Sequence, residues 1–470
     1  MPILILLCAA QFMVTLDITV VNVALPSIGL DLGIATSDLQ WVITSYTLAF
    51  GGLLLAGGRA ADLFGARRLF LGGLLIFTAS SLGAALAESE TQLLLARIGQ
   101  GVGAAFLSPA ALSLVSTVFP EGRERRRALT AWAAVAASGG AFGVLAGGFL
   151  TEILDWRAIF LINLPVGAVA FVTATRLLPS TAPRARGRFD LAGAALALFA
   201  LPTAIYAVVE APQAGWASTQ TIGLLMAAGA GIILLLAVEA RVREPMVSLA
   251  ALRRPQTATS MVLMMAGMGT VVSAFFFLTL YLQNVLGYTA LETGVAFFPG
   301  GVTLVAAAHL GGHLLPRIGP RGVLAGGMTV AAVGALLLAG LPAEGGYAAD
   351  VLPGLLVLDA GIGVAASGVF VTGMAGVGHD EAGAVSGLLS TAHELGVATV
   401  LSVLSTVAIG SIGPELVDRG GVDAAAIVAG FGDAFRVAAV LTVAAGGLAL
   451  VTLRRVTISD RGGHGHAMAH

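Results

Sequence analysis

The chain has 470 residues, of which 57% are hydrophobic and only 11% charged, and its mean hydropathy is +0.95. Soluble globular domains carry about 25% charged residues, so this composition excludes an ordinary soluble enzyme and favours an integral membrane protein. The 24 basic residues are all arginine and face 26 acidic ones, for a net charge of −2, which excludes a basic nucleic-acid surface and the lysine of a Walker A loop for ATP.

Apolar segments of membrane-spanning length recur along the whole chain. A bilayer core of about 30 Å needs about 20 apolar residues in a helix. The sequence predicts fourteen such helices and therefore an all-α integral membrane protein. They cover residues 3–25, 40–61, 69–87, 92–118, 128–150, 158–178, 190–210, 219–239, 257–282, 292–314, 322–341, 351–374, 383–409 and 434–453.

The arginines lie mostly on one side of these predicted helices. If the N-terminus is cytoplasmic, most arginines fall in cytoplasmic loops, and only Arg157, Arg419 and Arg436 fall outside. The positive-inside rule therefore predicts a multi-pass protein with both termini in the cytoplasm. Arginine-only basicity and abundant alanine suggest a high-GC bacterium, and the expected location is the bacterial inner membrane.

Two of the predicted cytoplasmic loops share a pattern of glycine, six residues, glycine, one residue and arginine. The first copy lies in Gly58–Arg68 and the second in Gly312–Arg321. An arginine after such a tight turn can reach a carboxylate or the carbonyls at a helix end, and Asp62 is a candidate partner. The alternative is that these arginines only set the topology. The residues predicted to form this conformational loop motif are Gly58, Asp62, Gly65, Arg67, Arg68, Gly319 and Arg321.

The offset between the two loops equals the offset between the starts of the first and ninth predicted helices. Helices nine to fourteen are therefore expected to repeat helices one to six in parallel orientation. This predicts six-helix bundles over residues 1–178 and 257–455, an inserted helix pair over 179–256, and a cytoplasmic tail over 456–470.

Several longer motifs resemble those of a known family. The chain is similar over nearly its whole length to the fourteen-span drug:proton antiporters of the major facilitator superfamily. The motifs are Leu16–Pro26, Gly58–Arg68, Arg97–Gly103, Gly139–Gly148 and Trp156–Pro165. The resemblance implies a major facilitator fold and efflux of drug-like molecules by alternating access. It also implies the proton gradient as the driving force, no cofactor, and the surrounding lipid as partner; we expect a monomer.

One motif departs from the family pattern. The antiporter motif usually has proline after its central glycine, where this chain has Val144. Proline would remove a backbone donor and bend the helix. The glycines predicted to permit close helix packing are Gly139, Gly143, Gly147 and Gly148. The departure leaves open a proton-coupled importer or an exporter of one specific metabolite.

Few titratable side chains lie well inside the predicted helices. An ionised group at mid-membrane costs about 2.5–3.5 kcal/mol, so each needs a partner or a function. Counting along their helices places Asp17 and Arg97 at similar depth in the outer half of the N-terminal bundle. Burial disfavours the ionised carboxylate and the guanidinium favours it, which suits a proton-coupling pair. A static structural pair is the alternative.

The second bundle offers two more acids, Glu394 and Asp359, as candidate sites of protonation or cation recognition. Structural roles are the alternative for both. His309 and His313 lie one turn apart, but an interfacial position is favoured over a metal pair. With the single cysteine Cys8, no metal site is predicted.

Aromatic and amide side chains are the remaining candidates. A substrate cavity is one location for them, and for the aromatic residues the lipid and its interface are the alternative. The predicted cavity residues are Asn22, Trp41, Tyr46, Gln100, Tyr281 and Phe298. The sequence as a whole predicts a proton-coupled exporter of hydrophobic, cationic or amphipathic drugs; a membrane-embedded enzyme or sensor is the third, least favoured class.

Overall fold

The computed structural model describes residues 1–120, 123–179, 191–242, 249–377, 382–412 and 424–453. Within these ranges every regular element is a helix. Ten of the described helical segments are long and apolar enough to cross a membrane, and one of them, α12, is long enough to cross twice. The protein is therefore a multi-pass membrane protein.

The first part of the chain forms the helices of the first six predicted spans. The sixth span comprises a short helix and a longer one, with helical φ and ψ at Ile162 between them. These elements are α1 (Pro2–Leu32), α2 (Gln40–Phe64), α3 (Ala66–Ala85), α4 (Glu90–Val118), α5 (Arg123–Ile153), α6 (Ala158–Leu161) and α7 (Asn163–Leu177). We call them the N-terminal helices.

The remaining helices follow the predicted order as well. The pair predicted to be inserted is α8 (Leu191–Ala214) and α9 (Thr219–Glu239), followed by the short α10 (Leu249–Leu252). The C-terminal helices are α11 (Pro255–Leu280), η1 (Tyr281–Val285), α12 (Ala290–Leu338), η2 (Tyr347–Val351), α13 (Leu352–Gly373), α14 (Ala382–Ile412) and α16 (Ala424–Thr452). Predicted spans ten and eleven both lie in α12, which is kinked at Gly319. Read in this way, the described helices correspond to all fourteen predicted spans.

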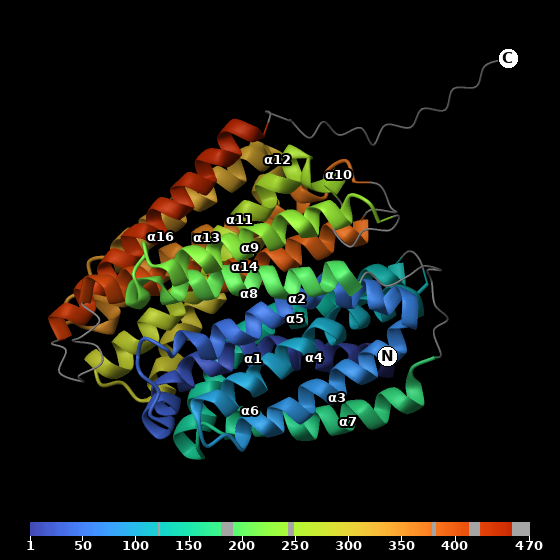
Figure 1. The fold of residues 1–470 in the computed structure, drawn as a ribbon, viewed down its shortest axis with the longest axis horizontal. Helices are drawn as coiled ribbons and strands as arrows, with labels where there is room; N and C mark the ends of the chain where they lie inside the picture. The colour runs from blue at the N-terminus through green and yellow to red at the C-terminus, as the bar shows by residue number, and fades with distance from the viewer. Residues whose placement is uncertain (121–122, 180–190, 243–248, 378–381, 413–423, 454–470) are drawn as a thin grey trace.

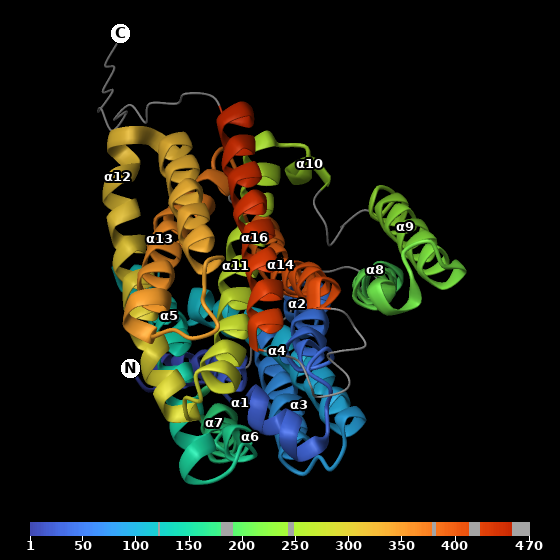
Figure 2. The ribbon, with the colours of Figure 1, turned by 90° about the vertical axis from the view of Figure 1, so that its left-hand side faces the viewer.

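The N-terminal and C-terminal helices form two groups, blue to teal and yellow to red in Figure 1. Between the groups, α5 packs on α12 and α2 packs on α14. Helices α8 and α9 stand to one side, where α8 contacts α2 and α14 and α9 packs on α8 (Figure 2). The bundle boundaries predicted at residues 178 and 257 stay a prediction.

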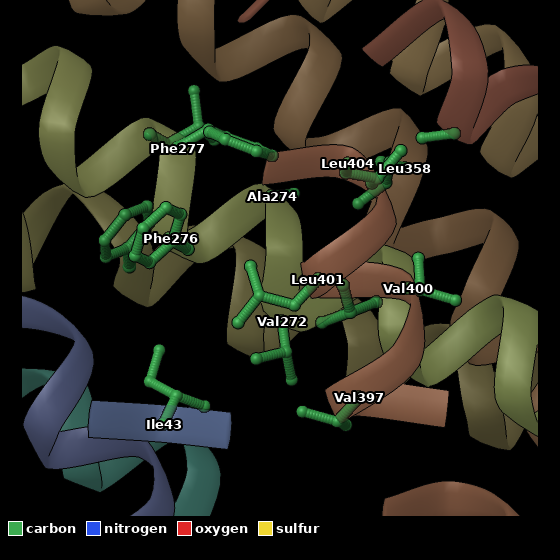
Figure 3. Packing of buried hydrophobic residues seen from close by; sticks show 14 of the residues in the cluster. Ile43, Val272, Ala274, Phe276, Phe277, Leu358, Val397, Val400, Leu401 and Leu404 are labelled. Carbon is green, nitrogen blue, oxygen red and sulfur yellow. The ribbon is translucent and has the colours of Figure 1, made fainter. Parts of the chain in front are cut away.

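Buried apolar side chains from both groups form one continuous cluster. Figure 3 shows part of it, with Ile43 of α2 lying towards Val272 of α11 and Val397 of α14. Each of these three side chains is at least nine-tenths buried. Close apolar packing of this kind holds α2 at the boundary between the two groups.

Candidate functional site

A buried ion pair lies among the N-terminal helices. The Nη1 of Arg97 on α4 donates to Oδ2 of Asp17 on α1 at 2.5 Å, and both residues are fully buried. The sequence placed these two residues at similar depth, and the structure brings them into contact. Their role in proton coupling stays a prediction.

Three neutral side chains complete the surroundings of Asp17. Oδ1 accepts hydrogen bonds from Gln100 Nε2 and from Asn163 Nδ2, each at 2.8 Å. Ser81 Oγ in turn accepts from Gln100 Nε2 at 2.8 Å and from Asn163 Nδ2 at 3.3 Å. The carboxylate of Asp17 is therefore held by three donors from α4 and α7. We call Asp17, Ser81, Arg97, Gln100 and Asn163 the charge network.

The guanidinium of Arg97 is fixed by further contacts. Its Nε donates to the Val42 carbonyl of α2 at 2.9 Å, and its Nη1 also donates to Gln100 Oε1 at 2.9 Å. Its Cζ lies 4.4 Å from the centre of the Tyr46 ring and 5.9 Å from that of Phe160. A cation over an aromatic face in a desolvated site is stabilised by about 2 kcal/mol.

This arrangement compensates the cost of burying two charges. A buried ion pair is tolerated when its geometry is good and its remaining donors and acceptors are satisfied, and removing one partner costs about 3–5 kcal/mol. The hydrogen bonds of the network connect α1 with α4 and α7, and α4 with α3.

The two acids of the C-terminal helices occupy different places. Glu394 on α14 is 6% exposed, and a Cβ added at Gly51 of α2 would lie 2.6 Å from its Cβ, so it lies at the α2–α14 contact. Asp359 on α13 is fully buried beside Gly300 of α12, and neither of its carboxylate oxygens has a hydrogen-bond partner among the described residues.

The predicted cavity residues do not gather in one place. Tyr46 and Gln100 are fully buried beside Arg97, and Asn22 is buried with its Oδ1 unpartnered among the described residues. Tyr281 is buried and donates to the Pro342 carbonyl at 2.8 Å. Phe298 is 39% exposed. Trp41 is half-buried and packs on Tyr206 of α8, with ring centres 5.9 Å apart.

The cavities lined by described residues include the following two. One of about 360 Å³ lies between the end of α12 and α16 and includes Asp433 and Arg436 in its lining. The other, of about 150 Å³, is apolar and lies between α8, α11 and α14, lined in part by Ile205, Met265 and Leu395. None of the predicted cavity residues lines either of them.

The glycines of the antiporter motif place α5 against two other helices. A Cβ added at Gly139, Gly143 or Gly147 would collide with Thr15, Thr19 or Val20 of α1, close to Asp17 in sequence. At Gly148 it would lie 2.5 Å from the Ala290 carbonyl oxygen of α12. Small residues permit this backbone approach between membrane helices. Helix α5 thereby links the helix of Asp17 to the C-terminal group.

The repeated loop motif has matching backbone geometry in its two copies. Gly65 has φ 92° and Gly319 has φ 72°, a region that side chains other than glycine rarely adopt. In the first copy, Arg67 Nη2 donates to the Thr175 carbonyl of α7 at 2.6 Å, Arg68 is exposed, and Gly58 lies in α2. The side chain of Asp62 lies outside the described residues, and Arg321 is half-buried.

Ser81 and Asn163 are the network members that the sequence did not single out. Asn163 lies in the Trp156–Pro165 motif, and an amide inside a predicted helix of that motif could have marked it as a candidate site residue. Ser81 lies in none of the motifs, so the sequence did not mark it. Within the described ranges, no three His, Cys, Asp or Glu side chains are arranged to hold a metal ion.

Comparison with known proteins decides the family, because the major facilitator superfamily model matches residues 7–401. The chain belongs to the major facilitator superfamily. It is 40% identical to the puromycin resistance protein pur8 of Streptomyces alboniger over 90% of this chain and 85% of that one. It is 37% identical to the multidrug resistance protein Stp of Mycobacterium tuberculosis (strain CDC 1551 / Oshkosh) over 84% of this chain and 73% of that one.

A solved structure of the superfamily fold also aligns with it. The structure of the POT family transporter PepTSo matches with a TM-score of 0.67 and 15% identity, covering 96% of this chain and 98% of that one. At this identity the match concerns the fold alone. Members of the superfamily are membrane transport proteins and generally need no cofactor, in agreement with the fold class and the resemblance found in the sequence.

Proposed function

We propose that this transporter exports hydrophobic or amphipathic, drug-like molecules in exchange for protons, with Asp17 as the coupling carboxyl. The observation that carries the proposal is the buried contact between Asp17 and Arg97, completed by Gln100 and Asn163. The relatives named for puromycin resistance and multidrug resistance support a drug-like substrate. We place the protein in a bacterial inner membrane, as a monomer with both termini cytoplasmic.

The proposed cycle uses two charge states of the network, one with Asp17 ionised and one with Asp17 protonated. With Asp17 ionised, Arg97 is paired and α1 is held to α4 and α7. When Asp17 takes up a proton from outside, the ion pair is lost and its helices are free to rearrange. Release of the proton towards the cytoplasm restores the pair, and the substrate moves in the opposite direction.

The proton gradient supplies enough free energy for useful export. One proton moving through about 100 mV yields about 2.3 kcal/mol, and one pH unit adds about 1.4 kcal/mol. The sum of about 3.7 kcal/mol supports roughly a 500-fold substrate gradient. The proposal therefore needs no second energy source and no cofactor.

Glu394 and Asp359 are proposed as additional acids in the C-terminal helices. Glu394 faces α2 across the contact between the two helix groups, and Asp359 has no partner among the described residues. A buried carboxylate without a partner is costly, so Asp359 is suited to hold a proton or to meet a cationic substrate. Both acids belong to the C-terminal helices, whereas the ion pair of Asp17 and Arg97 belongs to the N-terminal helices.

The test is transport into vesicles that contain only the purified protein. An imposed pH gradient is combined with a panel of puromycin, a lipophilic cation and an uncharged amphipathic dye, and both substrate accumulation and proton release are recorded. Coupled export predicts accumulation that an uncoupler abolishes and proton movement in the opposite direction. Accumulation that is insensitive to the uncoupler contradicts the proposal.

A second candidate function is export of one specific metabolite. Val144 favours it, because it replaces the proline typical of the antiporter motif. The same vesicle panel separates the two functions. Movement of several unrelated compounds supports multidrug export, whereas movement of a single class supports a specific exporter.

A further inference from the structure

Three basic side chains follow one another along an exposed face of α12. His309, His313 and Arg317 are spaced four residues apart, and all three residues are exposed. Residues four apart in a helix lie on the same face, and at a rise of 1.5 Å per residue they stand about 6 Å apart along the axis. We call these three residues the basic row.

The packing of α12 shows that the basic row lies on its lipid-facing side. The helix packs on α13 with another face, where a Cβ added at Gly311 would lie 2.5 Å from the Val364 carbonyl oxygen. On the side of the row, Val302, two turns before His309, is 50% exposed and Leu310 is 54% exposed. Large apolar side chains that are uncovered on a helix of membrane-spanning length face lipid.

Basic side chains are unusual in such a position. Within membrane helices, histidine and arginine almost always face the protein interior or a water-filled cavity. The predicted span ends at residue 314, so His309 and His313 lie in its last two turns and Arg317 lies just beyond it. The row therefore runs from the edge of the hydrocarbon layer into the layer of the lipid headgroups, on the side that the arginine distribution predicts to be cytoplasmic.

Backbone hydrogen bonds orient both imidazole rings in the same way. Nδ1 of His309 donates to the Val305 carbonyl at 2.9 Å, and Nδ1 of His313 donates to the His309 carbonyl at 2.8 Å. A carbonyl oxygen only accepts hydrogen bonds, so Nδ1 carries the hydrogen in each ring. Nε2 is therefore the ring atom that can take up a proton and then donate to an anion.

The basic row has open space beside it and no protein anion to pair with. A Cβ added at Gly312, between the two histidines in sequence, would meet no atom within 4 Å. In the part of the chain that the structure describes, no carboxylate pairs with Arg317. A row of cationic groups at the membrane surface without a protein counterion is complementary to a negatively charged headgroup.

We propose that the basic row binds the phosphate of an anionic phospholipid. Arg317 supplies a permanent charge and parallel N–H donors, and the two Nε2 atoms donate to the phosphate oxygens when protonated. The acyl chains then lie along the exposed apolar side chains that precede the row, Val302 among them. A soluble phosphate has the same charge but no chains, so the apolar surroundings favour a lipid. This lipid site does not depend on the proposed proton coupling.

The test is a lipid titration of the purified protein in detergent, followed by native mass spectrometry. Phosphatidylglycerol is compared with phosphatidylcholine of the same acyl chains, and the dissociation constant of the first bound lipid is measured for each. Glycerol 3-phosphate, which has the phosphate without the chains, is added as a competitor in equal amount. We expect the parent protein to bind phosphatidylglycerol more tightly than phosphatidylcholine and to keep it in the presence of the competitor.

Two variants remove charge from the basic row without altering a packed surface. One is Arg317→Gln, and the other combines His309→Gln with His313→Gln. We expect each to weaken phosphatidylglycerol binding about fivefold, which corresponds to about 1 kcal/mol per basic residue at an anionic surface, and to leave phosphatidylcholine binding unchanged. Their unfolding temperatures are compared with the parent's, and either variant provides the test if the other does not fold.

Arg253→Gln is the matched control. Arg253 is another exposed arginine on the same predicted side of the membrane, directly after α10. Helices α10 and α12 lie on opposite sides of α16 in Figure 2, so this variant removes one positive charge far from the basic row. It should bind phosphatidylglycerol as tightly as the parent does.

The outcomes decide between a specific lipid site and its alternatives. Weaker phosphatidylglycerol binding in both test variants, with parent-like binding in the control, supports the site. Equal binding of the two lipids by the parent contradicts it, as does parent-like binding by both test variants. If glycerol 3-phosphate displaces the lipid, the ligand is a soluble anion, and if the control loses as much affinity, the lipid responds to overall charge; the proposal is then wrong.

Discussion

The side-chain amide of Asn163 donates a hydrogen bond to Oδ1 of Asp17, 2.8 Å away, and so ties the beginning of α7 to α1. Both side chains are buried, and Asn163 also reaches Ser81 of α3. The two bonds of Asn163 together link α7 with α1 and α3. Removing the Asn163 side chain therefore tests how much the charge network contributes to stability and transport.

Asn163→Ala removes this bond and leaves the Asp17 carboxylate with one donor fewer. Loss of a hydrogen bond to a buried charged group is expected to cost about 1–3 kcal/mol. We expect a lower unfolding temperature in detergent and weaker proton-driven accumulation in vesicles. Thr329→Ala is the control, because among the described residues its hydroxyl bonds the Ala325 carbonyl of its own helix alone, and it should behave like the parent. Parent-like accumulation by Asn163→Ala would show that the bond is dispensable.

Gly65→Ala and Gly319→Ala test the repeated loop motif. Both glycines have positive φ, where a Cβ costs about 1–2 kcal/mol. We expect each variant to lower the transport rate or the unfolding temperature. Gly72→Ala is the control, because a Cβ there meets no atom within 4 Å and alanine favours the helix. If all three variants have the same transport rate and unfolding temperature, the positive φ of these two glycines is not required.

Gly148→Ala tests the contact between α5 and α12. The added Cβ would lie 2.5 Å from the Ala290 carbonyl oxygen, so the two helices must separate at that point. We expect slower counterflow, the exchange of labelled for unlabelled substrate without a gradient, because this contact joins the two helix groups between which we propose that access alternates. Gly140→Ala on the same helix meets no atom within 4 Å and should retain the parent rate. If Gly148→Ala exchanges substrate at that rate too, the close contact is not needed for transport.

The helices could be predicted from the sequence because span length depends on the thickness of the bilayer. Asp17 and Arg97 could be placed at the same depth for the same reason, since depth follows from position along the helix. The rotation of each helix could not be predicted, because a helix that is apolar on all sides has no periodicity to mark its packed face. Ser81 was therefore missed, and Gln100 was expected in a substrate cavity although it bonds Asp17.

The break between spans ten and eleven could also be predicted. The sequence placed it between residues 314 and 322, and Gly319, whose φ and ψ are not helical, lies there and divides α12 into two helical parts. Span six was predicted as one helix, and α6 and α7 cover it with helical φ and ψ at the intervening Ile162.

Asp17→Asn tests the central claim most directly. Asparagine keeps the size of the side chain but cannot exchange a proton, so the network is held in one charge state. Parent, Asp17→Asn and the control Asp433→Asn, which removes an exposed acid, are compared in vesicles under an imposed pH gradient. We predict that Asp17→Asn loses uphill, proton-driven accumulation while the control retains it. An Asp17→Asn protein that still concentrates substrate against its gradient would contradict the claim that Asp17 couples proton entry to export.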